Sequence, residues 1–75
     1  MVEHSEPVEV HEDFDNGNPK QHGFRLGGEM HGAWSFWRRD GTLMRTGAFD
    51  RGRQIGAWRT FDRAGRVVKE TTFPE

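Results

Sequence analysis

A 24-residue repeat constrains this 75-residue chain more than any other feature of its sequence. Residues 31–50, HGAWSFWRRDGTLMRTGAFD, align without a gap on residues 55–74, IGAWRTFDRAGRVVKETTFP. A repeat of this length is one supersecondary unit that packs against its neighbours. The aligned positions carry glycine, aromatic or branched side chains in both copies: Gly32 on Gly56, Trp34 on Trp58, Trp37 on Phe61, Gly41 on Gly65, Leu43 on Val67, and Phe49 on Phe73.

An eroded copy of the unit precedes these two. Moving the frame back by 24 residues places Gly23 on Gly47, while Val10 takes the position of the tryptophan. We therefore predict one repeat domain over residues 8–75, with units at about 8–30, 31–54 and 55–75, after a flexible acidic tail at 1–7. Terminal units of an array are often atypical. In the third unit Thr71 stands where the second has Gly47.

Each unit has the signature of a β-hairpin, which is two strand-forming segments joined by a turn that contains glycine. The turns DNGN at 15–18, RRDG at 38–41 and DRAG at 62–65 occupy equivalent places, and turns at 27–30 and 50–53 join one hairpin to the next. The predicted fold is all-β, an open twisted antiparallel meander of about six strands. Whether residues 8–14 form the first of them is left open.

The loop length predicts which side chains share a face of the sheet. A loop of Arg39, Asp40 and Gly41 places Trp37 opposite Leu43, and the same loop in the next unit places Phe61 opposite Val67. Simple alternation then puts these pairs on one face with Phe49 and Phe73, and Trp34, Phe36 and Trp58 on the other. A bulge between Trp34 and Trp37 would instead put both on one side. In either case Gly23 and Gly47 offer flat backbone to a neighbouring ring.

Charge is unevenly distributed along the chain. Residues 1–16 contain six acidic residues and no lysine or arginine, whereas residues 17–75 contain eleven basic and six acidic residues. The chain has no cysteine, and no segment is apolar enough to span a bilayer. With no signal-like N-terminus, these features predict a soluble cytoplasmic protein that is not transmembrane.

The residues that could carry chemistry do not form a recognisable site. His4, His11, His22 and His31 lack the short spacings of zinc ligands. Glu12, Asp13 and Asp15 are better explained as solvated charge than as an acid–base pair. We therefore expect no catalytic residue, no metal, no cofactor and no enzymatic activity.

The repeat resembles the MORN-repeat variant, which occurs in small bacterial repeat proteins including the YwqK-type antitoxin proteins. The motif positions are Gly32, Trp34, Trp37, Gly41, Leu43, Gly47, Phe49, Gly52, Gly56 and Trp58. The resemblance covers roughly residues 17–73 and is strong only over 31–73; the first unit lacks the aromatic pair. It implies a sheet of successive hairpins that acts in binding, with no catalytic residues. Related repeats in other members are linked to scaffolding, dimerisation and lipid contact.

The functional prediction is a non-enzymatic protein-interaction module whose partner is a second copy or a toxin-like protein. A sheet of one layer cannot bury both faces, and large exposed apolar patches mark interfaces. The alternative is binding of an anionic surface, phospholipid headgroups or nucleic acid, through turn arginines and exposed aromatic rings. The partner-binding residues predicted here are Trp34, Phe36, Trp37, Trp58, Phe61, Arg45 and Arg59, and Gly65, Val67 and Phe73 join the motif positions as structural repeat residues.

Overall fold

The computed structural model describes residues 6–75, which form six β-strands and no helix. Residues 1–5 of the predicted tail lie outside the described residues. No described segment is therefore a helix that could cross a membrane. The strands are β1 (Val8–Asp13), β2 (Pro19–Leu26), β3 (Glu29–Trp37), β4 (Leu43–Asp50), β5 (Arg53–Phe61) and β6 (Val67–Phe73).

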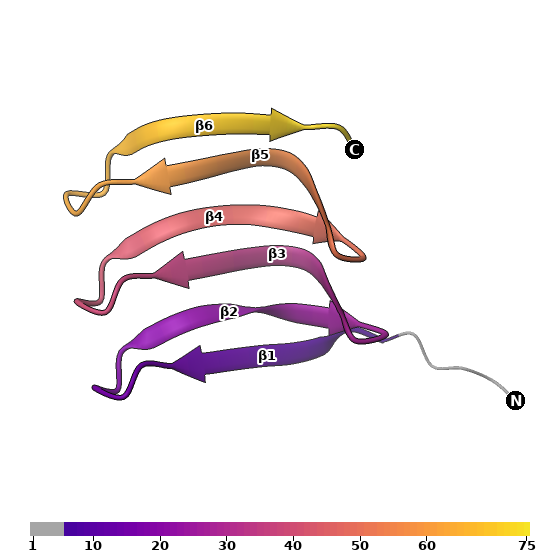
Figure 1. Cartoon of the computed structure of the whole chain (residues 1–75), viewed down its shortest axis with the longest axis horizontal. Coiled ribbons are helices and arrows are strands. Elements are labelled where there is room, and N and C mark those ends of the chain that lie inside the picture. The colour runs from indigo at the N-terminus through magenta and orange to yellow at the C-terminus, as the bar shows by residue number, and fades with distance from the viewer. Residues whose placement is uncertain (1–5) are drawn as a thin grey trace, which may run out of the picture.

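The six strands form one open antiparallel sheet in which every strand pairs with its sequence neighbours. Figure 1 shows the strands side by side from β1 to β6, with three turns at one end and two at the other. The molecule measures 49 × 32 × 11 Å along its principal axes. All six strands belong to this one sheet, so the described residues contain no second layer of strands. The predicted all-β meander is confirmed, and residues 8–13 are its first strand.

Three equivalent turns close the hairpins at one end of the sheet. In the middle one, the Arg38 amide donates to the Thr42 carbonyl and the Gly41 amide donates to the Arg38 carbonyl. Both bonds recur 24 residues earlier and 24 residues later. The glycine that ends each turn has a φ of 86° to 94°, a conformation that residues with a Cβ rarely adopt. The predicted three-residue loop that ends in a left-handed glycine is confirmed.

Two tighter turns join the hairpins at the other end. Gly27 and Gly28 both have positive φ, and so do Arg51 and Gly52 in the second turn. Positive φ at both central residues is the mark of a two-residue type I′ hairpin, whose twist matches that of the flanking strands. Arg51 is the single non-glycine residue with positive φ among residues 6–75, and its φ is 49°.

The GAW motif is a bulge that repeats in β3 and β5. Between β2 and β3 the pairing passes from His22 opposite Ser35 to Phe24 opposite His31, so that β3 contains two more residues than β2 over this stretch. Between β4 and β5 the same shift occurs at residues 46–48 and 55–59. Gly32 and Gly56 open the two bulges with φ values of 79° and 68°. Each bulge turns the following tryptophan back over the preceding strand.

The two tryptophans lie across glycines and form the core. A Cβ on Gly23 would lie 2.1 Å from the Trp34 ring, and a Cβ on Gly47 would lie 2.1 Å from the Trp58 ring. Trp34 is 1% exposed and Trp58 is 4% exposed. Burial of about 200 Å² of tryptophan surface is worth about 5 kcal/mol per ring. The predicted role of Gly23 and Gly47 as flat backbone for a ring is confirmed.

One part of the predicted face assignment is wrong. Trp37 pairs with Leu43 and Phe61 with Val67, as expected. Phe49, however, packs edge-on against Trp34 and Trp58, and Phe73 packs against Trp58. A register shift between Phe36 and Trp37 adds one residue to β4 at Met44, and a matching shift adds one to β6. The extra residue reverses the alternation, so both phenylalanines lie on the tryptophan side.

Replacement of Gly47 by alanine should destabilise the protein by about 2 kcal/mol, because the new methyl group overpacks the site under the Trp58 ring. Urea unfolding measures the change. The control is Thr71→Ala, at the equivalent position of the third unit. The double variant Gly47→Ala, Trp58→Leu should lose less than the sum of its two single variants. If the free-energy changes of the two single variants simply added up in the double variant, the contact between Gly47 and the Trp58 ring would be contradicted.

Arg51→Asn should raise the free energy of unfolding by about 0.5–1 kcal/mol, since asparagine tolerates the left-handed conformation that arginine adopts here at a cost. Arg53→Asn, two residues later in β5, serves as the control for the loss of an exposed arginine. Equal effects of the two substitutions in thermal and urea unfolding would show that backbone conformation is not the cause.

Candidate functional site

One face of the sheet, which we call the tryptophan face, carries a continuous row of rings. Trp34 and Phe36 stack with ring centroids 5.9 Å apart, and Phe36 stacks on Trp58 at 6.2 Å. Phe49 fills the space between the two tryptophans, with centroids 5.0 Å from Trp58. Each indole Nε1–H donates to a backbone carbonyl ten residues earlier, at 3.0 Å for Trp34 and 3.1 Å for Trp58. The two indoles are therefore buried and hydrogen-bonded, whereas Phe36 and Phe49 are half-buried beside them.

The Arg45 side chain lies over two rings of this row. Its guanidinium lies 5.3 Å from the centre of the Phe36 ring and 5.4 Å from that of Trp58. A cation over an aromatic face is attracted by the ring quadrupole. Arg45 is itself exposed, so it presents a positive charge to solvent above the buried rings.

The opposite face, which we call the histidine face, carries the polar rings and the second set of aromatic side chains. His11 and His22 meet edge to face at 6.3 Å, and the His22 Nε2 lies 2.7 Å from a carboxylate oxygen of Glu9. With Pro19 and Trp37 these side chains line a hollow of about 300 Å³. Trp37 and Phe61 are half-buried here, so this face also offers aromatic surface to solvent.

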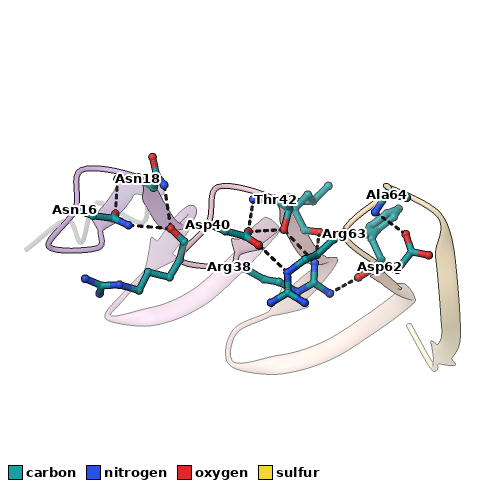
Figure 2. Close-up of polar contacts among 11 residues, drawn as sticks. Asn16, Asn18, Arg38, Asp40, Thr42, Asp62, Arg63 and Ala64 are labelled. Carbon is teal, nitrogen blue, oxygen red and sulfur yellow. Dashed lines mark hydrogen bonds and ion pairs between the residues drawn. The ribbon is translucent and has the colours of Figure 1, made fainter.

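Side chains of neighbouring turns link the three hairpins at one end of the sheet (Figure 2). Asn16 and Asn18 each donate an amide hydrogen to the Arg39 carbonyl at 2.9 Å. Arg39 in turn forms an ion pair with Asp15. The first turn is thus tied to the second by one charged contact and two neutral ones.

Asp40 ties the second turn to the third. Its carboxylate accepts from the Thr42 hydroxyl at 2.6 Å, from the Thr42 amide at 3.0 Å and from Arg63 Nε at 2.7 Å. The hydrogen bonds from Thr42, followed by that from Arg63, hold the pKa of Asp40 well below its usual range. Arg38 adds a contact to β5, because its guanidinium donates to the Phe61 carbonyl.

Asp62 organises the third turn in the same way. Its carboxylate accepts from the Arg66 amide and the Ala64 amide, both at 2.9 Å, and from Arg66 Nε at 3.1 Å. The backbone hydrogen bond from Arg66 is the main cause that lowers the pKa of Asp62. Both aspartates therefore hold turns in shape, a structural use of a low pKa rather than a catalytic one.

The two outer strands have one side without a strand partner among the described residues. β1 pairs with β2 alone and β6 pairs with β5 alone. The large hydrophobic side chains that are most exposed lie on these strands: Val8 at 65%, Val67 at 51% and Val68 at 62%. Open edges present backbone donors and acceptors that another strand can pair with.

The predicted partner-binding residues divide between the two faces. Trp34, Phe36, Arg45 and Trp58 are brought together on the tryptophan face, whereas Trp37 and Phe61 lie on the histidine face. Arg59 pairs with Glu70 at 2.7 Å. The expected exposure of the rings is wrong for Trp34 and Trp58, because the bulges fold them onto glycine. The structural repeat residues occupy equivalent turns, bulges and strand pairs.

Sequence reasoning missed the contacts between turns. The signal was present, since Asp15, Arg39 and Arg63 recur at the same place in consecutive turns and carry charges of both signs. The histidines, by contrast, pair separately with carboxylates, His11 with Asp13 at 2.9 Å and His22 with Glu9 at 2.7 Å. Within residues 6–75 no group of three or more histidines, cysteines or carboxylates is placed to hold a metal ion. His4 lies outside the described residues.

Comparison of the chain with protein-family models, curated proteins and solved structures finds no match.

Replacement of Asp40 by asparagine should reduce stability at pH 7 and flatten its dependence on pH in the acid range. The lowered pKa of Asp40 means that its stabilising effect is complete above the unfolded value of about 3.9 and is lost as the pH falls toward the folded value. Urea midpoints between pH 7 and pH 2 measure this. Glu75→Gln is the control, and an unchanged pH profile in Asp40→Asn would contradict the assignment.

Proposed function

We propose that this chain is a non-enzymatic protein-interaction module that binds protein partners through the open edges of its sheet. The observation that carries the proposal is the coincidence of two open edges with the exposed valines: Val8 lies on β1, and Val67 and Val68 lie on β6. Addition of a strand to an open edge gives affinity through backbone hydrogen bonds, and flanking side chains give specificity.

The two faces take different parts in this proposal. Trp34 and Trp58 act indirectly, because their buried rings hold the strands of the single layer together. Trp37 and Phe61, half-buried on the histidine face, extend the contact beyond the edge. The resemblance to the MORN-repeat variant agrees with a binding role. A toxin-like partner is one form of the same proposal.

The alternative, binding of an anionic surface through arginines, has weaker support. Arg39, Arg53, Arg59, Arg63 and Arg66 pair with carboxylates of the same chain. A phosphate would have to compete with these contacts. Arg45 is the best-placed exposed cation for such a ligand, since it lies over two rings rather than beside an acid.

Site-specific photo-crosslinking tests the proposal. A crosslinking amino acid at Val8 or at Val68 should form adducts with protein, either with a second copy or with another chain of the native cell. The control is the same amino acid at Ala57, an exposed position on the inner strand β5. Substitution of Trp37 and Phe61 by alanine should reduce adduct yield at the edges. Adducts that form equally well at Ala57, or at none of the three positions, would overturn the proposal.

A further inference from the structure

The two open edges are consecutive members of one repeating series. β1 is equivalent to β3 and β5, because Val10 has the place of Trp34 and Trp58 in its unit. β6 is equivalent to β2 and β4, because Thr71 has the place of Gly23 and Gly47. Within the chain, β2 is followed by β3 and β4 is followed by β5, so a glycine strand is followed by a tryptophan strand. A strand with the direction and phase of β1 would therefore continue the sheet after β6.

The residues at the two edges are complementary in volume. At each inner junction a tryptophan lies on a glycine, where a Cβ would approach the ring to 2.1 Å. Thr71 has a Cβ and so excludes a ring, and Val10 has no ring to place there. A β-branched pair fits a direct cross-strand position well. β1 also has Val8 where β3 and β5 have the bulge glycine, so it can pair residue for residue without a bulge.

The inner junction between β4 and β5 gives the register of this pairing. There Arg45 lies opposite Thr60, and Thr46 lies opposite Arg59. The equivalent residues at the edges are Lys69 and Glu70 of β6, and Glu12 and His11 of β1. Lys69 would thus lie opposite Glu12 of a second copy, and Glu70 opposite its His11. Continued regular pairing would place Val10 opposite Thr71 and Val8 opposite Phe73.

The turns extend this charge complementarity. In the chain, Arg39 of the second turn pairs with Asp15 at the same place in the first. The third turn has Arg63 at this place. Its guanidinium already pairs with Asp40 of the second turn, so Asp15 of a second copy would share this arginine with Asp40. At this junction Glu12 and Asp15 of one copy would therefore lie beside Lys69 and Arg63 of the other.

We infer that β6 of one copy pairs with β1 of a second copy, in the register that sets Lys69 against Glu12, and that the partner of the open edges is this chain itself. The inference rests on the proposed function, since it names the partner of those edges. The contact is heterologous, because it uses a different edge on each copy. It leaves one β1 and one β6 open in every dimer, so association continues beyond two copies.

Charge reversal on the full chain tests the register. Lys69→Glu sets two acids against each other at the junction, and Glu12→Lys sets two bases against each other. Each variant alone should associate about five- to tenfold more weakly than the natural chain in sedimentation equilibrium. A mixture of the two should recover, because each junction then joins opposite charges. The double variant Glu12→Lys, Lys69→Glu should recover as well.

Lys20→Glu and Glu29→Lys are the matched controls, since they make the same charge changes on the inner strands β2 and β3. They should leave the association constant unchanged. Raising the ionic strength from about 0.01 M to about 1 M shortens the Debye length from about 30 Å to about 3 Å. This should reduce the difference between the single variants and the natural chain. Circular dichroism of every variant separates a loss of association from a loss of fold.

Three results would overturn the inference: association that stops at a dimer, single reversals that behave like the controls, or no recovery in the mixture. A chain that is monomeric at millimolar concentration would also overturn it. In that case the crosslinking experiment decides separately. Adducts from Val8 or Val68 to a different protein would preserve the proposed function, while their absence would remove both proposals.

Discussion

The contact between a tryptophan ring and a glycine of the preceding strand is the interaction on which the rest of this structure depends. A sheet without a second layer has nothing to bury its apolar side chains against. Here the rings of Trp34 and Trp58 supply that layer. Each ring lies flat on the glycine of the preceding strand and donates its indole hydrogen to a backbone carbonyl of that preceding strand. Both needs of the indole group, an apolar contact and a polar partner, are met at one place.

The contacts between turns complement this core at one end of the sheet. They are exposed, so each ion pair is screened and contributes little alone. Their contribution is geometric. Asp40 and Asp62 each fix the shape of their own turn, and Asp40 also binds Arg63 of the neighbouring turn. Hairpins that are joined by the ring row in the middle are thereby held in register at their tips (Figure 2).

Most of the fold could be predicted from the repeat, because glycine positions and turn composition are local signals that recur at one offset. Strand pairs such as Trp37 with Leu43 followed directly from loop length. The side on which Phe49 lies could not be predicted in this way, since one extra residue at Met44 reverses alternation and leaves no mark on composition. The predicted exposure of the tryptophan rings was wrong for a related reason. The two-residue bulge that folds Trp34 onto Gly23 depends on the backbone of two strands together.

The bulges also determine the order in which the two partners of each ring contact are synthesised. Each turns its tryptophan back onto the preceding unit, so Trp34 lies on Gly23 and Trp58 on Gly47. During synthesis each glycine strand therefore leaves the ribosome before the ring that covers it. The two ends are therefore not equivalent in biosynthesis: a chain interrupted after the second unit retains a covered Gly23, whereas one that lacks the first unit begins with a ring that has no platform.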